Sequence, residues 1–180
     1  SRISLDVYIA LGVLYREAGR LDESLEALLQ AKKINAESVR VLQELGITYA
    51  AAAAAAPDGG DPANYLKESA RYFSKAEDSL QAAVALNTGS WSAREELANF
   101  YFDTERFAKA VEVYDQVLAL NPGVTRALNG KGAALSWLGQ EPAAEAMWKL
   151  AIEQALASEN YGPLGQIYQN LGGINYYRGD

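Results

Sequence analysis

Small and large residues recur along this chain in blocks with a period of about 34 residues. Four stretches share one pattern, in which a long side chain, leucine in three of them, precedes a small residue and a large residue follows three positions later. They are residues 11–15, 45–49, 97–101 and 131–135. The small residues are Gly12, Gly46, Ala98 and Gly132. The first two lie one period apart, as do the last two, and the longer middle step leaves an insertion of 18. Recurrence at a fixed period indicates tandem structural repeats, because an unrelated helical bundle does not need it.

Each copy is followed by a second set of small and large residues. One equivalent position holds Ser24, Ala76, Ala110 and Ala144, and the position seven residues later holds Ala31, Ala83, Val117 and Ala151. Between them stand the large residues Leu28, Leu80, Tyr114 and Trp148. Small residues that face each other let two helix backbones approach closely, while the large residue fills the seam beside them. We therefore expect each unit to be a hairpin of two helices.

Residues that end and start helices agree with this phase. Gly19, Gly139 and Gly179 fall where a first helix should end in a left-handed residue. Asp22 favours the first turn of a second helix, and Pro142 suits the start of another, where a missing N–H costs little.

These residues resemble the tetratricopeptide repeat family, whose signature is W-x-x-L-G-x-x-Y followed by A-x-x-x-F, A and P over about 34 residues. Residues 91–124 match it best, whereas Arg94, Lys131 and Glu141 depart from it. The resemblance implies an all-α, right-handed α-α superhelix of four repeats and a C-terminal half-repeat, in a single array over residues 1–180. The expected repeats are residues 5–38, 39–90, 91–124 and 125–164, followed by the half-repeat 165–180. A fifth small residue, Gly172, marks that half-repeat.

The 18-residue insertion lies near residues 52–70, between the two helices of the second repeat. It begins in an alanine run, is interrupted at residues 57–60 by Pro-Asp-Gly-Gly, and becomes helical again from Ala63. We expect both helices of this hairpin to be about two turns longer than their neighbours. Tyr65 and Leu66 then either pack on the alanine face or make a lateral contact with a partner.

In the resembled family, the first helices of successive repeats line a groove that receives a peptide or a partner helix. The matching positions here are Ile9, Val13, Arg40, Gln43, Ile47, Asn99, Phe102, Arg126, Asn129, Trp137 and Tyr176. Ile9, Trp137 and the other apolar members are expected to offer surface that the core does not need. Asn99 and Asn129 lie in the first helices of consecutive repeats, and their amides can hold a peptide backbone. A clamp for the acidic tails of chaperones does not fit, because Ile9 and Val13 replace its lysine and asparagine.

The composition narrows the chemistry. The chain of 180 residues has no histidine and no cysteine, which removes imidazole bases, thiolates and the common zinc ligands. Its formal net charge of −7, without a basic stripe, argues against nucleic acid as a partner. No apolar run is long enough to span a bilayer. Adjacent carboxylates such as Glu95 and Glu96 point to different helix faces and indicate solvated surface. We expect no enzyme, no cofactor and no metal; the compartment, cytoplasmic or bacterial periplasmic, stays open.

The sequence thus predicts a protein–protein interaction module that binds a peptide or helix in its groove, as an adaptor or scaffold in complex assembly. The alternative is a regulatory or self-association arm of a larger enzyme or signalling protein, because residues 176–180 end where a further helix should start. Self-association through that end is a third reading.

Overall fold

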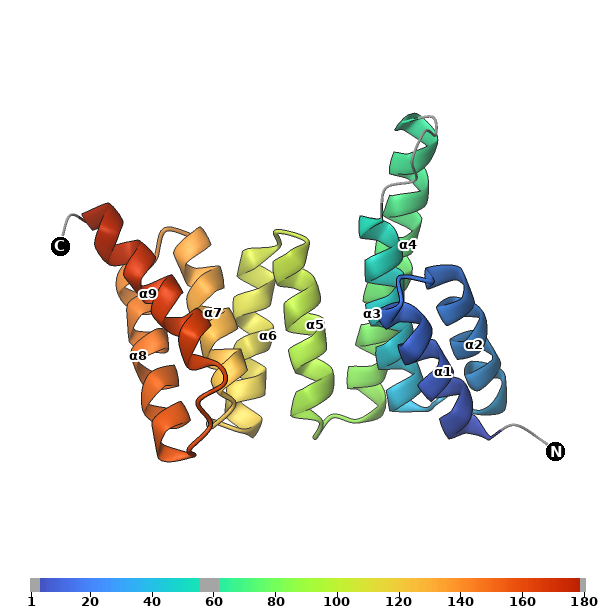
Figure 1. Cartoon of the computed structure of the whole chain (residues 1–180), viewed down its shortest axis with the longest axis horizontal. Helices are drawn as coiled ribbons and strands as arrows, with labels where there is room; N and C mark the ends of the chain where they lie inside the picture. Colours follow the sequence, from blue (N-terminus) through green and yellow to red (C-terminus); the bar gives the residue numbers. More distant parts are fainter. Residues whose placement is uncertain (1–3, 56–61, 179–180) are drawn as a thin grey trace. The chain divides into compact units, whose positions relative to one another are not determined.

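The computed structural model describes residues 4–55 and 62–178, and all regular structure in them is helical (Figure 1). The expected all-α helical-repeat class is therefore confirmed. The helices are α1 (Leu5–Glu17), α2 (Leu21–Ile34), α3 (Val39–Ala54), α4 (Pro62–Leu86), α5 (Trp91–Asp103), α6 (Phe107–Leu120), α7 (Thr125–Trp137), α8 (Glu141–Ala157) and α9 (Leu164–Arg178).

The chain forms two compact units, Ser1–Thr88 and Gly89–Asp180, here called the N-terminal unit and the C-terminal unit. In the N-terminal unit α1 pairs with α2, α3 pairs with α4, and α2 packs on α3. In the C-terminal unit α5 pairs with α6 and α7 with α8, while α6 packs on α7 and α8 on α9. Each unit is thus built of helical hairpins that stack through the second helix of one and the first helix of the next.

Serine residues start three of the first helices. The hydroxyl oxygens of Ser4, Ser38 and Ser90 accept hydrogen bonds from the backbone N–H groups of Val7, Val41 and Ala93, over 3.4, 3.4 and 3.1 Å. Such a cap satisfies one of the free donors of a helix start and is worth about 1 kcal/mol. These serines recur in the same place before α1, α3 and α5, so the cap belongs to the repeat.

The predicted seam between the two helices of a hairpin is present in both units. A Cβ atom added to glycine would lie well inside van der Waals contact with the large residue of the second helix: 2.5 Å from Leu28 Cγ at Gly12, 2.5 Å from Leu80 Cγ at Gly46 and 2.6 Å from Trp148 Nε1 at Gly132. Glycine is thus required at these positions by the close approach of the paired helices.

The turns after α1, α5 and α7 each use a left-handed residue. Gly19 and Gly139 have φ of 74° and 73°, as predicted, and Glu105 takes the same position after α5 with φ of 58°. A side chain in this conformation is strained by about 1 kcal/mol or more, so Glu105 departs from the rule that the glycines follow. Gly179 lies outside the described residues.

The insertion lengthens the second hairpin unequally, so the expectation of two extra turns in each helix was wrong. α3 has 16 residues against 13 in α1, whereas α4 has 25 against 14 in α2. Helix α3 ends at Ala54, ahead of the sequence position of Pro57, since proline disfavours helix in the residues before it. Tyr72 of the long helix stacks on Tyr49, with ring centroids 6.0 Å apart.

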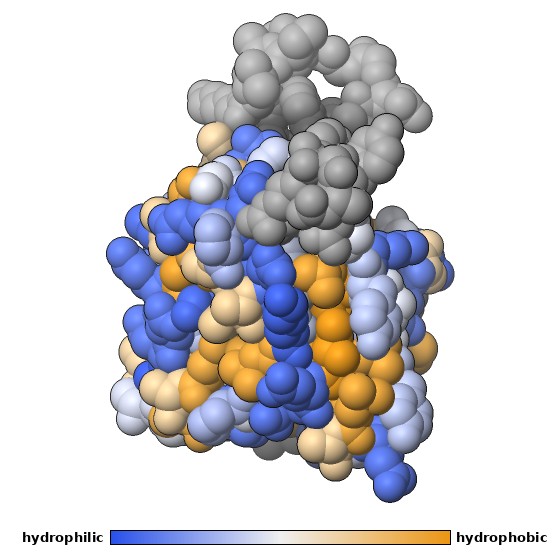
Figure 2. Space-filling model, turned by 90° about the vertical axis from the view of Figure 1, so that its left-hand side faces the viewer, coloured by the Kyte–Doolittle hydropathy of each residue, from blue (hydrophilic) through white to orange (hydrophobic). Residues whose placement is uncertain are grey.

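Helix α9 packs on α8 and closes the C-terminal core. Ile167 is fully buried in a cluster with Leu128, Leu135 and Trp148. On its other side, no described atom lies within 4 Å of the place where a Cβ on Gly172 would stand. Figure 2 looks onto the side of the molecule where α8 and α9 lie in Figure 1, and apolar side chains remain visible there between hydrophilic ones. Gly172 therefore stands at a seam position of the repeat, but no helix faces it among the described residues.

Replacing Gly132 by alanine is expected to lower the free energy of unfolding by about 1–3 kcal/mol, because the new methyl group collides with Trp148. The indole cannot yield freely, since its Nε1 donates a hydrogen bond to the Asn129 carbonyl over 3.2 Å. Gly172→Ala is the matched control and should stabilise by about 0.5–1 kcal/mol, the gain in helix propensity alone. Urea unfolding followed by circular dichroism measures both; equal effects would contradict the close-packed seam.

Candidate functional site

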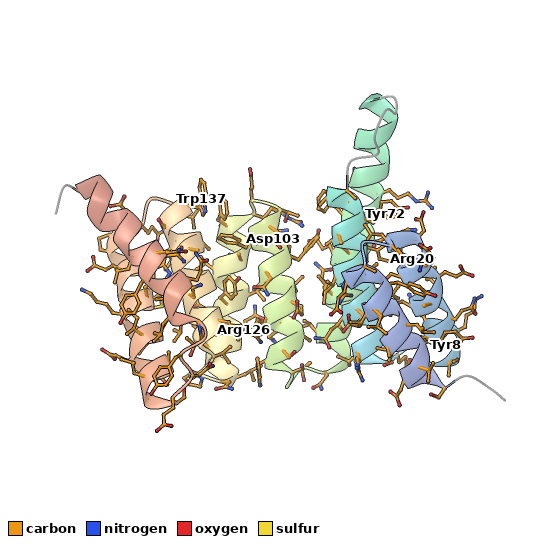
Figure 3. All side chains as sticks on the ribbon, viewed as in Figure 1. Tyr8, Arg20, Tyr72, Asp103, Arg126 and Trp137 are labelled. Carbon is orange, nitrogen blue, oxygen red and sulfur yellow. The ribbon has the colours of Figure 1, made fainter. Side chains whose placement is uncertain are left out.

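The first helices of the C-terminal unit line a groove of about 1010 Å³. The side chains that line it carry amides, carboxylates and hydroxyls in addition to a guanidinium. They include Trp91, Glu95, Glu96 and Asn99 of α5, Tyr114 of α6, Thr125, Arg126, Asn129 and Gly130 of α7, and Gln166 of α9. Figure 3 labels Arg126 and Trp137 at the two ends of α7. The groove therefore runs across consecutive first helices, where the repeat places residues of equivalent position side by side.

A buried carboxylate lies in the wall of this groove. Glu95 is 3% exposed, and its Oε2 accepts a hydrogen bond from Arg126 Nη2 over 2.9 Å. The other oxygen, Oε1, is buried and has no hydrogen-bond partner among the described residues. The Arg126 side chain is 72% exposed. A carboxylate normally accepts several hydrogen bonds when buried, so Glu95 keeps unused acceptor capacity.

Two asparagines of the groove are oriented through their oxygens. Asn99 Oδ1 accepts a hydrogen bond from the Tyr114 hydroxyl over 2.7 Å, and Asn129 Oδ1 accepts one from Asn170 Nδ2 over 2.9 Å. Within the part of the chain that the structure describes, the amide nitrogens of Asn99 and Asn129 donate no hydrogen bond. These bonds hold the two amides in place and leave their N–H groups as donors for a bound molecule.

Tyr114 reaches the groove from α6 because Gly130 of α7 leaves room for it. A Cβ on Gly130 would collide with the Tyr114 hydroxyl. Burial raises the pKa of Tyr114 well above its ordinary value, and the negative charges of Asp103, Glu95 and Glu96 raise it further. The hydroxyl therefore stays protonated and keeps donating to Asn99, in surroundings of negative potential.

Aromatic side chains gather at the other end of α7. Phe107 stacks on Trp137 with ring centroids 5.5 Å apart and an interplanar angle of 4°. Phe102 meets Phe107 edge-on at 5.4 Å. Trp137 is 70% exposed although Phe102 and Phe107 are half-buried. This aromatic cluster presents one face of an indole to solvent.

In the N-terminal unit, charged side chains of α1 and α3 contact each other. Arg16 Nη1 donates to Glu44 Oε2 over 2.7 Å and to Thr48 Oγ1 over 3.1 Å, and both charged side chains are mostly buried. Near the other ends of these helices, Arg40 and Asp6 approach to 4.0 Å. A separate cavity of about 510 Å³ in this unit lies along α2 and is lined by none of the predicted groove residues.

Of the residues that the sequence predicted for the groove, Asn99, Arg126 and Asn129 lie together in its lining. Phe102 and Trp137 form the aromatic cluster instead. Ile9 is 1% exposed and belongs to the core, so the prediction that it offers free surface was wrong. Val13, Gln43 and Ile47 are half-buried and Arg40 is exposed. The side chains of Tyr65, Leu66 and Tyr176 lie outside the described residues.

The sequence interpreted the Glu95 carboxylate as solvated surface, and this was wrong. The carboxylate is instead buried and is paired with Arg126 of the next repeat. Tyr114 was predicted only as seam packing, yet its hydroxyl also orients Asn99. The signal for both was present in the repeat register, which places residues 95 and 126 on neighbouring first helices.

Comparison with known proteins agrees with this architecture. The family model for the tetratricopeptide repeat matches residues 5–38 and 92–123. Two segments of this chain, 66 of its 180 residues, are therefore similar to tetratricopeptide repeats. Such repeats are protein-interaction modules, and the chain is accordingly a module for binding protein partners.

Solved structures with the same fold are related only distantly in sequence. MamA is 24% identical, with a TM-score of 0.67 over 88% of this chain and 82% of that chain. PilF of Pseudomonas aeruginosa is 14% identical, with a TM-score of 0.67 over 94% of this chain and 75% of that chain. A mutant O-GlcNAc transferase of Thermobaculum terrenum is 19% identical, with a TM-score of 0.65 over 85% of this chain but 26% of that chain. No curated protein matches the sequence. The TM-scores show that these proteins share the fold of this chain.

In the described part of the chain, no group of three or more histidine, cysteine, aspartate or glutamate side chains is placed to hold a metal ion. None of the helices in the same residues is both long and apolar enough to cross a membrane.

Tyr114 should make stability depend on alkaline pH. Above about pH 10 a tyrosine of the unfolded chain loses its proton, while the raised pKa keeps Tyr114 protonated in the folded chain. The unfolded state then binds fewer protons, so the free energy of unfolding falls as pH rises, by up to about 1.4 kcal/mol per pH unit. Urea unfolding at pH 9, 10 and 11 should show a smaller fall in Tyr114→Phe than in the native chain. Tyr168→Phe, at a 53% exposed position, is the control and should leave the native dependence intact.

Proposed function

We propose that the chain works as an adaptor or scaffold, without catalysing a reaction, and holds an extended peptide of a partner protein in the groove of its C-terminal unit. The observation that supports this most directly is the groove itself, in which Asn99, Asn129 and Arg126 from consecutive first helices line one volume of about 1010 Å³. That volume is at the upper end of the range typical of ligand sites.

The polar lining suits a peptide backbone. Asn99 and Asn129 each offer an amide N–H group that has no acceptor among the described residues, and each is held by a bond to its own oxygen. Carbonyl oxygens of an extended peptide are acceptors at regular spacing, so two fixed donors on adjacent repeats select an extended segment. Because the donors are already oriented, binding costs less conformational entropy.

The aromatic cluster supplies an apolar anchor. Trp137 is 70% exposed and is stacked on Phe107, so an apolar side chain of the peptide can cover an indole that is already held in one orientation. Exposed tryptophan in a rigid setting is typical of the few residues that contribute most of the binding energy at an interface.

A second candidate function is that of a regulatory or self-association arm within a larger protein. The observation that favours it is the likeness to the O-GlcNAc transferase, because the matched region is 26% of that chain. There the same fold is one part of a longer polypeptide.

Asn99→Ala/Asn129→Ala is expected to lose the partner that the native chain captures from a cell extract, since both free donors are removed. Gln30→Ala/Gln116→Ala removes two amides outside the groove lining and should retain that partner. Quantitative mass spectrometry of the captured proteins gives the comparison. Equal capture by all three forms would place the contact elsewhere on the chain.

Trp137→Ala should weaken the affinity for the captured partner at least tenfold, about 1.4 kcal/mol or more. Its effect on the free energy of unfolding should stay under about 1 kcal/mol, because the side chain is mostly exposed. Leu14→Ala, at a 61% exposed position in the other unit, is the control for loss of exposed apolar surface. Titration calorimetry measures the affinities, and an unchanged value for Trp137→Ala would remove the anchor from the proposal.

A further inference from the structure

The buried carboxylate of Glu95 is paired unlike that of Glu44 in the N-terminal unit. Arg16 and Glu44 are 18% and 19% exposed, and the Arg16 guanidinium also bonds to Thr48, so both charges are enclosed by the fold. Arg126 makes a single bond to Glu95 and is otherwise 72% exposed. The first pair has the form of a permanent link between helices, whereas the second consists of a fixed carboxylate and a loosely held cation.

Glu95 also has more to gain from an additional donor. Its Oε1 is buried with no partner among the described residues, which is a costly state for a charged oxygen. The residue lines the groove together with Asn99 and Arg126. A guanidinium presented from the groove in place of Arg126 can bond to both carboxylate oxygens at once, which is a stronger arrangement than the single bond of Arg126.

We propose that Glu95 selects the partner peptide by binding an arginine side chain of that peptide, or less well a lysine, and that Arg126 holds this position as a replaceable substitute. This deepens the proposed function and rests on it. The exchange replaces one ion pair by another, so the buried carboxylate is never left without a counter-charge. Arg126 moves into solvent, where its charge is already mostly hydrated.

Charge favours a cationic ligand over an anionic one. The ionisable acidic and basic side chains of the groove lining are Glu95, Glu96 and Arg126, so removal of Arg126 from Glu95 leaves two carboxylates. After burial, the charges of Asp103, Glu95 and Glu96 also raise the pKa of the Tyr114 hydroxyl, which is in keeping with a preference for a cationic ligand. The whole chain carries a formal charge of −7, which attracts basic segments over a longer range.

An acidic peptide that binds directly to Arg126 is the opposing possibility, and the two predict opposite effects of one substitution. If Arg126 competes with the ligand, Arg126→Ala strengthens binding; if Arg126 contacts the ligand, the same substitution weakens it. Glu95→Gln removes the selecting charge and keeps the size of the side chain. Glu112→Gln on α6 is the matched control, because it makes the same charge change at an exposed residue outside the groove lining.

The experiment is selection of displayed random 12-residue peptides on the native chain and on the three variants, followed by sequencing. The native chain and Glu112→Gln should enrich arginine at one position of the peptides, with lysine second. Arg126→Ala should increase that enrichment, and Glu95→Gln should abolish it while peptides are still selected. For one selected peptide, exchange of its arginine for glutamine should weaken binding to the native chain at least tenfold in fluorescence anisotropy, and binding to Glu95→Gln by less than twofold.

The outcomes separate this inference from the proposed function. Selection of peptides with no charge preference, or of acidic peptides whose enrichment disappears in Arg126→Ala, overturns the role of Glu95 and leaves the groove as the binding site. Failure of every form to select peptides overturns both. Circular dichroism of each variant tests folding, and Arg126→Gln, which keeps a long polar side chain over Glu95, replaces Arg126→Ala if the latter has lost helix.

Discussion

The close approach of paired helices at glycine is the constraint on which the rest of this structure depends. At Gly132 a single added carbon would lie 2.6 Å from Trp148, so the separation of α7 and α8 is set by the absence of a side chain. The same contact recurs at Gly12 and Gly46, so three of the hairpins share a close-packed seam. Asn99 and Asn129, on the first helices of consecutive hairpins, line the same groove.

The features that could be predicted from the sequence are those that repeat. The helix starts, the left-handed turns at Gly19 and Gly139, and the seam residues follow from local geometry that each repeat reproduces. The three groove residues on α5 and α7 follow from the resemblance, which assigns several positions of each first helix to the groove side. A periodic pattern reports which face a residue occupies, and in these cases the face was sufficient to place it.

What could not be predicted depends on side-chain length and on neighbours from other repeats. Ile9 and Glu95 stand at groove positions, yet both are buried. Glu95 also pairs with Arg126 of the following repeat, a contact that no pattern within one repeat contains. The prediction for the insertion failed for a related reason. The length of the insertion fixes the number of residues added to the hairpin. Their division between α3 and α4 depends on where proline ends the first helix and on what the second helix can pack against.

The two units show how an ion pair between consecutive first helices can serve stability or recognition. Between α1 and α3, Arg16 and Glu44 are both enclosed, and a third residue completes the hydrogen bonding, so the charges stabilise a helix contact and offer nothing to a ligand. Between α5 and α7, the carboxylate is enclosed and the arginine is not. A buried charge costs free energy unless it is fully paired. A carboxylate that is only partly paired beside a groove can therefore be stabilised by a further hydrogen-bond donor. Selectivity for a cation in that groove then follows from the same desolvation that makes Glu95 costly, because only a ligand that restores its pairing can displace Arg126.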